Sequence, residues 1–94
     1  MVTDSNVCIF EDSLDTDGLR HLANEGKKKC NIFAVLSGNN KAGYSYIIAS
    51  EKVNLRELIK DANEKLSGRG GGREDMVQGS FGATRTEIED YFKN

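Results

Sequence analysis

The sequence has few of the side chains that carry out catalysis or bind metal ions. It contains one histidine, His21, and two cysteines, Cys8 and Cys30, which do not form a Cys-x-x-Cys motif. One histidine and two distant thiols do not match the ligand spacing of a familiar metal site. A Ser-His-Asp set or an isolated carboxylate dyad cannot be assembled convincingly either. The sequence therefore predicts neither a metal site nor an independent hydrolase.

The same three residues are expected to have structural or solvent-exposed roles. Cys8 and Cys30 each lie near an apolar strand pattern, which predicts ordinary buried thiols. A disulfide between them is disfavoured in a reducing cytoplasm. His21 lies off the apolar stripe of its predicted helix, so we expect a solvated surface residue rather than a catalytic base.

Long apolar segments are also absent. No run approaches the roughly 20 apolar residues that cross a bilayer as a helix. Residues 1–4 lack a basic segment followed by an apolar one, so nothing indicates secretion. We therefore expect a cytoplasmic protein with no membrane partner.

Size and charge limit the remaining classes. The 94 residues are enough for one domain but too few for two cores, and they contain no internal repeat and no long linker. With 30% charged and 37% apolar residues, the composition is that of a soluble globular domain rather than a disordered tail. A net charge of −2 excludes a surface that is basic throughout, so nucleic-acid binding would need a local patch.

Two basic groups could form such a patch. Residues 27–29 are three lysines at the end of the first predicted helix, where cations also complement the helix dipole and cap free carbonyl groups. The second group consists of Lys65, Arg69 and Arg73. Ligand contact and helix capping are both open for the lysine triplet, and the second group is the stronger candidate for binding.

Hydrophobic patterning predicts four strands. Residues 7–10 form a short continuous apolar run, typical of a strand buried on both faces, and we expect it at or near the centre of the sheet. Residues 31–37 and 43–50 are joined by about five turn-forming residues, which predicts an antiparallel hairpin. Residues 76–81 form the last predicted strand, in which Gly79 marks a bulge or a close approach of another backbone.

Three predicted helices begin at capping residues. Residues 12–17 are rich in N-cap types, and apolar positions then repeat at helical spacing as far as Gly26. A capping residue followed three positions later by glutamate predicts further helices from Asn54 and Thr84. The predicted order is strand-helix-strand-strand-helix-strand-helix, which indicates an α/β fold with the helices packed on a mixed β-sheet.

Tyr44 and Tyr46 lie on one face of their predicted strand. Two aromatic side chains on one sheet face could stack on nucleic-acid bases. Packing against a helix or a neighbouring strand is the more frequent use of such a pair, and it is the interpretation that we prefer.

The most informative segment is residues 67–82, which holds six of the ten glycines directly after the second predicted helix. Glycine leaves no Cβ in the way of a ligand, and successive amide N–H groups in a glycine-rich loop can converge on an anion. Arg69 and Arg73 would add guanidinium groups, which bind phosphate through paired donors. The loop can equally be a flexible connection or a packing corner, with Arg73 paired internally with Glu74 or Asp75.

Residues 51–59 and 66–79 carry a resemblance to a known family. After a strand hairpin come a helix that opens behind a Val-Asn pair, a Gly-Gly-Gly-Arg loop and a Gln-Gly strand. In this order they resemble the C-terminal DHH-associated (DHHA-type) domain of alanyl-tRNA synthetases and of AlaX-type alanyl-tRNA editing proteins. The resemblance covers nearly the whole chain. It implies that residues 1–94 are a single DHH-associated-type domain, the C-terminal fragment of a longer protein.

The resemblance implies binding rather than catalysis. In this family the domain is a nucleic-acid-binding appendage, and in the synthetase it is implicated in gripping the tRNA elbow and in dimer contacts. For this chain it implies tRNA as the partner, with alanine tRNA as the expected identity, and a homodimer as a second kind of assembly. The expected nucleic-acid-binding residues are Lys65, Arg69, Gly70, Gly71, Gly72, Arg73 and Gln78.

The parent protein stays open at this point. Residues 76–92 are closer to the editing proteins than to the synthetases, so the parent would be an alanyl-tRNA deacylase or an alanine–tRNA ligase. DHH phosphoesterases carry a related domain, but their glycine run ends in histidine, where this chain has Arg73. The zinc-binding residues of the editing domain have no counterpart here, so we expect no cofactor in this chain, with zinc or ATP bound elsewhere in the parent. A structural or dimerisation module is the competing role.

Overall fold

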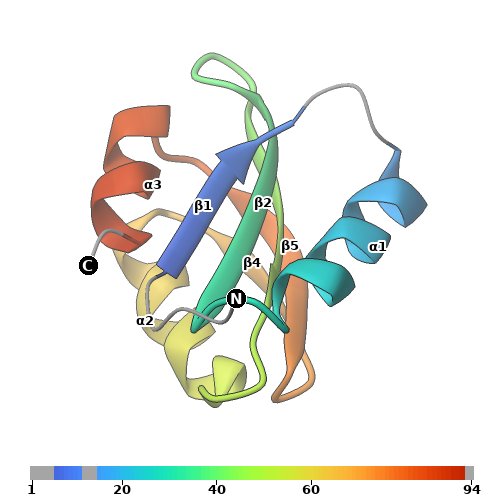
Figure 1. Cartoon of the computed structure of the whole chain (residues 1–94). Helices are drawn as coiled ribbons and strands as arrows, with labels where there is room; N and C mark the ends of the chain where they lie inside the picture. The colour runs from blue at the N-terminus through green and yellow to red at the C-terminus, as the bar shows by residue number, and fades with distance from the viewer. Residues whose placement is uncertain (1–5, 12–14, 93–94) are drawn as a thin grey trace.

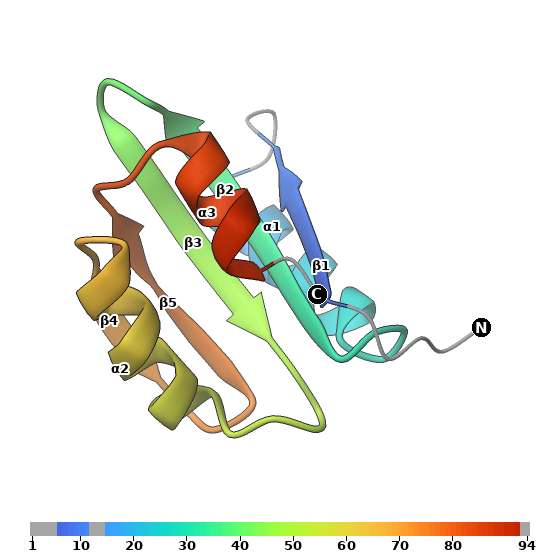
Figure 2. The same cartoon turned by 90° about the vertical axis from the view of Figure 1, so that its left-hand side faces the viewer.

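Five strands form one mixed sheet, with helices on both of its faces (Figure 1). The structure is a computed structural model that describes residues 6–11 and 15–92. Helix α1 lies on one side of the sheet, and α2 and α3 lie in front of the other side, as the rotated view shows (Figure 2). The elements are β1 (Asn6–Phe10), α1 (Thr16–Gly26), β2 (Ile32–Asn39), β3 (Gly43–Ala49), α2 (Leu55–Lys65), β4 (Arg69–Gly72), β5 (Met76–Phe81) and α3 (Arg85–Phe92).

The strand order in the sheet is β1-β2-β3-β5-β4. Strand β1 runs parallel to β2, and the other neighbouring pairs are antiparallel. The predicted α/β class and the predicted hairpin of β2 and β3 are therefore confirmed.

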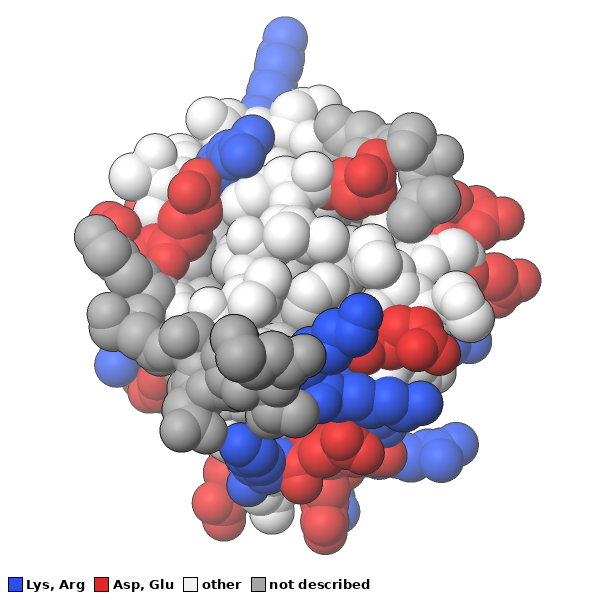
Figure 3. Space-filling view, viewed as in Figure 1, with Lys and Arg blue, Asp and Glu red and all other residues white. Residues whose placement is uncertain are grey.

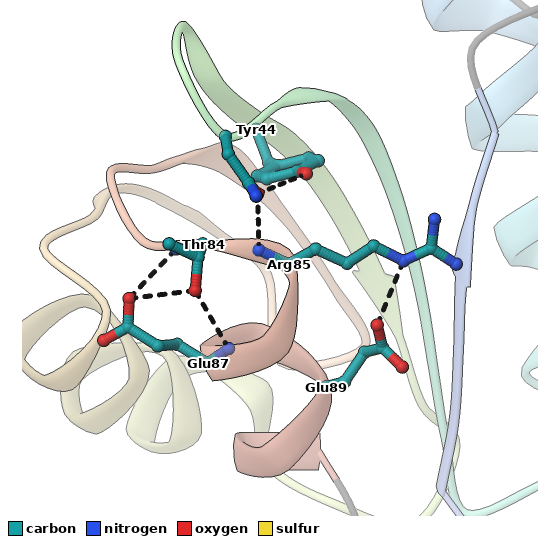
Figure 4. A network of polar contacts seen from close by, with 6 residues as sticks. Tyr44, Thr84, Arg85, Glu87 and Glu89 are labelled. Atoms are coloured by element: carbon teal, nitrogen blue, oxygen red, sulfur yellow. Dashed lines mark hydrogen bonds and ion pairs between the residues drawn. The ribbon is translucent and has the colours of Figure 1, made fainter.

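Local capping explains where the helices begin. The Asp15 side chain accepts a hydrogen bond from the Gly18 amide at 2.8 Å, which caps α1, while residues 12–14 of the predicted cap segment lie outside the described residues. Helix α3 opens with a full capping box. The Thr84 amide donates to Glu87 Oε1 at 3.1 Å, and the Glu87 amide donates to Thr84 Oγ1 at 3.3 Å (Figure 4).

The two faces of the sheet have separate cores. The larger core lies under α2 and α3 and contains Tyr46, Phe81 and Leu55, each at most 2% exposed. The smaller core lies under α1 and joins Leu19 and Ala23 to apolar residues of β2 and β3. The 94-residue chain therefore buries apolar side chains on both faces of the sheet, with many more of them under α2 and α3 than under α1.

The predicted central position of the strand at residues 7–10 is wrong. Strand β1 is at an edge of the sheet, and all five of its residues are half-buried. Cys8 and Phe10 pack toward the larger core and Ile9 toward the smaller one, so both faces of the strand are covered. A continuous apolar run indicates that both faces of a strand are covered, but it does not indicate whether the strand has a neighbouring strand along each of its edges.

The predicted glycine-rich loop is also wrong in part, because Arg69–Gly72 form strand β4. This strand pairs antiparallel with β5 and places Gly70 opposite Gly79 and Gly71 opposite Gln78. In an extended strand, successive N–H groups point to opposite sides, so they do not converge on one anion. The Arg73 amide is itself engaged, donating to the Met76 carbonyl oxygen at 2.8 Å.

The predictions for His21, Tyr44, Tyr46 and Cys30 are confirmed, whereas Cys8, predicted to be buried, is only half-buried. Tyr44 and Tyr46 are buried, and the Tyr46 ring stacks on Phe81 with a centroid separation of 4.2 Å, so neither tyrosine is available to bases. His21 is exposed. Cys30 is buried and its thiol donates to the Gly26 carbonyl oxygen, while Cys8 is half-buried and also free.

Charge on the view in Figure 3 is mixed in sign. Lys and Arg side chains lie beside Asp and Glu side chains around a central area that carries neither. This matches the small net charge and leaves local patches as the way to attract an anion. Among the described helices, none has the length and apolar character needed to cross a membrane.

Candidate nucleic-acid interface

Helix α1 covers only part of its side of the sheet. It packs on Val35 of β2 and on Ile47 and Ala49 of β3. Side chains alternate between the two faces along a strand, so every second residue of β5 and β4 lies on the face that α1 covers in part. These residues lie beyond the apolar cluster under α1. We call this uncovered region the open sheet face, defined by Ser45, Arg69, Gly71, Gln78 and Ser80; four of these residues are exposed and Gly71 is half-buried.

On the opposite, covered face, the glycines of β4 and β5 are required by packing. Gly70 and Gly79 face each other over the Tyr46 hydroxyl. A Cβ built on Gly70 would lie 2.6 Å from Tyr46 Oη, and one built on Gly79 would lie 2.7 Å from the same atom. Gly70 also has φ +141°, which other residues rarely adopt. The prediction that Gly79 marks a close approach of another backbone is confirmed.

Gly71 differs from its neighbours because nothing lies within 4 Å of the position that its Cβ would occupy. Neither packing nor a positive φ explains a glycine here. Gly71 lines a concave site of about 410 Å³, which we call the Gly71 hollow. It is lined by Arg20, Asn24, Gly71, Gly72, Arg73, Asp75, Met76 and Gln78.

Two arginines and one carboxylate set the charge of the Gly71 hollow. Arg20 Nη2 donates to Gln78 Oε1 at 2.8 Å, which holds both side chains at the wall of the hollow. The carboxylate of Asp75 lies 3.5 Å from Lys27 Nζ. Within residues 6–11 and 15–92, Arg73 forms no ion pair, so the alternative in which it pairs with Glu74 or Asp75 is not found there. The Arg73 guanidinium therefore lines the hollow without an ion pair to a described residue, and Asp75 lines the same hollow.

The structure brings together some of the predicted binding residues and separates others. Gly71, Gly72, Arg73 and Gln78 all line the Gly71 hollow, whereas Gly70 faces the covered side. Arg69 lies on the open sheet face, opposite Ser80. Lys65 belongs to α2, on the other side of the sheet, where its Nζ lies 3.4 Å from Asp61 and 6.0 Å from the Tyr91 ring centroid.

Asp75 and Met76 line the hollow without having been predicted as binding residues. Arg20 and Asn24 are the lining residues outside the glycine-rich segment, and they were not predicted either. They lie one helical turn apart on α1, and 58 residues separate Arg20 from its partner Gln78. The only sequence signal was their place on the polar side of an amphipathic helix, which is equally typical of a solvated surface.

Metal-binding groupings are not found in the part of the chain that the structure describes. Those residues include no group of three or more His, Cys, Asp or Glu that could hold a metal ion. Burial and, to a smaller extent, the negative charge of Glu89 raise the pKa of the Cys8 thiol to about 12, and burial also raises the pKa of Cys30. Both thiols are therefore protonated at neutral pH and are poor nucleophiles.

Fold and site together define a small α/β domain with one half-covered sheet face and an arginine-lined hollow beside a glycine-rich edge strand. A family model described as the DHHA1 domain matches residues 4–92, and the chain belongs to this family.

The similar proteins are consistent with this family. The chain is 38% identical over 78 residues to alanine–tRNA ligases from two serovars of Leptospira interrogans, copenhageni and Lai. That alignment covers 76% of this chain but only 8% of each ligase. The fold matches the crystal structure of the C-Ala domain from Aquifex aeolicus alanyl-tRNA synthetase, with a TM-score of 0.71, 23% identity and coverage of 100% of this chain and 96% of that one.

Proposed function

We propose that this domain binds tRNA through the open sheet face and holds it for chemistry carried out on other domains of a longer protein. The observation that carries the proposal is the Gly71 hollow, where a glycine without a packing role stands beside Arg20, Arg73 and Gln78. Guanidinium groups and amides suit the phosphate and sugar contacts that position RNA. The similarity to alanine–tRNA ligases supports alanine tRNA as the ligand.

The parent that we propose is an alanyl-tRNA synthetase-like protein of the cytoplasm. The two ligases reported above support this choice over the editing protein, which stays a prediction from the sequence pattern. ATP, or zinc in an editing domain, would then be bound outside these 94 residues. The domain itself acts as a binding appendage, not as a catalyst.

The proposal is tested by titrating the domain with alanine tRNA at several salt concentrations. Changing Arg69 and Arg73 together to Ala removes two phosphate-binding groups, so we expect weaker binding and a slope of log affinity against log salt that is shallower by about 0.7 to 0.9 per lost contact. The matched control changes Lys52 and Lys60 to Ala, which removes the same charge at two exposed positions that do not line the Gly71 hollow. An unchanged affinity and slope in the arginine variant would contradict the proposal, as would equal effects in both variants.

A steric variant separates shape from charge. Gly71→Val puts a branched side chain into the hollow without changing net charge, and valine suits an extended strand. We expect the fold to be kept and tRNA affinity to fall about tenfold, equal to roughly 1.4 kcal/mol. If the Gly71→Val domain folds and binds tRNA with wild-type affinity, the Gly71 hollow is not part of the tRNA interface.

A second candidate function is assembly. The observation that favours it is β1, an edge strand with a half-buried apolar sequence. Unpaired strand edges are sites for pairing with another chain. Sedimentation of the domain at several concentrations tests this function, because a strictly monomeric species would count against it.

A further inference from the structure

A second concave site lies at the other end of the open sheet face. It is formed where the turn between β2 and β3 meets the start of β4 and the end of β5, and its volume is about 350 Å³. We call it the Lys41 groove. The lining residues that matter for its chemistry are Lys41, Ser45, Ser67, Arg69 and Ser80.

The charge in the Lys41 groove has one sign. Lys41 and Arg69 line it, and its lining includes no Asp or Glu. Both cations are exposed, and neither side chain forms an ion pair within the part of the chain that the structure describes. The Gly71 hollow, by contrast, includes Asp75. In a protein of net charge −2, a groove with two cations and no carboxylate is a local site of positive potential.

The strand register lines up hydrogen-bond donors beside these cations. Ser45 of β3 pairs with Ser80 of β5, which pairs with Arg69 of β4. Neighbouring strands are about 4.8 Å apart, so this row of side chains extends over roughly 10 Å on one face. The serine hydroxyls have no hydrogen-bond partner among the described residues, and Ser45 and Ser80 are exposed. Hydroxyl and guanidinium donors in one row suit an oxygen-rich anion.

The turn that carries Lys41 is ordered by its own hydrogen bonds. Asn39 Oδ1 accepts from the Lys41 amide at 3.0 Å and from the Ala42 amide at 2.7 Å. These bonds use backbone donors, so a change of the Lys41 side chain leaves them in place. The backbone of Lys41 is therefore held by the hydrogen bonds of the turn, and its exposed side chain extends from an ordered position.

We propose that the Lys41 groove binds a phosphodiester group of the tRNA backbone, as a second contact separate from the Gly71 hollow. The inference rests on the proposed tRNA binding, and it assigns Lys41 and the Ser45–Ser80–Arg69 row to the same RNA-facing surface. The RNA then runs along the open sheet face from one concave site to the other.

The test compares Lys41→Ala with Lys60→Ala, which removes one exposed lysine from α2 on the other side of the sheet. Affinity for alanine tRNA is measured between about 50 and 200 mM salt. We expect Lys41→Ala to weaken binding about threefold and to make the salt slope shallower by about 0.7 to 0.9, with no change of slope for Lys60→Ala. Equal changes of affinity and of salt slope in the two variants would contradict phosphate binding in the Lys41 groove.

A charge reversal gives a second readout. Ser80→Asp places a carboxylate opposite Arg69, so we expect a larger loss of affinity than for Lys41→Ala, with the fold checked by circular dichroism. Loss of affinity in Ser80→Asp equal to that in the neutral variant Ser80→Ala would contradict an anion site.

If wild-type protein does not bind tRNA, both the groove and the proposed function fail. If it binds, and Arg73→Ala alone or Gly71→Val weakens binding while Lys41→Ala and Ser80→Asp do not, the groove alone fails.

Discussion

Gly70 and Gly71 are neighbours in β4, yet they face different environments. Gly70 faces the covered side, where its missing Cβ lets the strand pass over Tyr46 and Asn63. Gly71 faces the open side, where nothing occupies the space of a Cβ. The comparison teaches that one glycine run can meet a packing constraint on one face and leave open space on the other, because successive residues of a strand point to opposite faces.

The same difference extends to the whole of each face. The covered face carries stacked aromatic rings and buried hydrogen bonds, such as the one that Tyr46 Oη donates to Asn63 Oδ1 at 3.2 Å. The open face carries exposed serines, a glutamine and arginines. Stability should therefore depend mainly on the first face and affinity on the second.

Phe81→Ala should have the largest effect on stability. Phe81 is 2% exposed and stacks on Tyr46, so truncation leaves a cavity in the larger core. We expect the free energy of unfolding to fall by about 3–5 kcal/mol, measured by urea denaturation. A loss below about 1 kcal/mol would show that the two faces do not differ as described.

Gly70→Ala should come next. The added methyl group meets the Tyr46 hydroxyl and the backbone of β5, and the residue has to keep a positive φ. Overpacking and backbone strain together predict a destabilisation of roughly 2–4 kcal/mol. Denaturation of this variant beside wild type is the measurement, and an unchanged midpoint would mean that the strand can shift away from Tyr46 at little cost.

Gly71→Ala should change stability least of these glycine substitutions and in the opposite direction. Alanine in an extended strand loses less conformational entropy on folding than glycine, and it meets no atom here. We expect unchanged stability or a gain of up to about 1 kcal/mol. Destabilisation as large as that of Gly70→Ala would contradict the assignment of these two residues to different faces.

The smallest effect concerns the exposed side of the helices that cover the larger core. The Tyr91 hydroxyl donates to Asp61 Oδ2 at 2.6 Å, and this bond, with Lys65 nearby, holds the pKa of Asp61 below its usual value. Burial and Asp61 in turn raise the pKa of Tyr91. A carboxyl with a lowered pKa stabilises the fold at neutral pH, and this contribution is lost as the pH falls below about 4.

Tyr91→Phe should therefore raise the pKa of Asp61 toward its ordinary value, measured by NMR titration of the carboxyl carbon. Because Asp61 is exposed, we expect only a slight change in acid stability. Lys65→Ala is the comparison, because it removes the nearby charge and keeps the hydrogen bond, and an unchanged pKa of Asp61 in Tyr91→Phe would contradict the role of the bond.

Local signals in the sequence predicted the helix starts well. The Thr84–Glu87 capping box and the Asn54 cap depend on residues three positions apart or fewer, and the structure contains both. Strand β4 was not predicted, because a Gly-Gly-Gly run has low strand propensity and is extended here only through pairing with β5. The edge position of β1 was missed because it depends on long-range strand order.

The candidate site was predictable only in part. The glycine run, Arg73 and Gln78 were found because unusual composition marks them. Arg20 and Lys41 were not, since each reaches the open face through contacts between distant parts of the chain. Lys65 was chosen for its closeness in sequence to Arg69, but helix α2 places it on the covered side. Sequence distance is a poor guide where a strand follows a helix directly.

The side chain of Asn40 connects the turn between β2 and β3 to helix α3. Its Oδ1 accepts from the Tyr44 hydroxyl and from the Arg85 amide, both at 2.8 Å, so the turn before Lys41 is fastened to the first residue of α3 (Figure 4). Arg85 also reaches back over the Phe10 ring at 4.4 Å. Asn40 therefore links the turn that carries Lys41 to the start of α3. If the Lys41 groove binds a phosphate as proposed, we expect slower hydrogen exchange of the α3 amides, although α3 packs on the other face of the sheet.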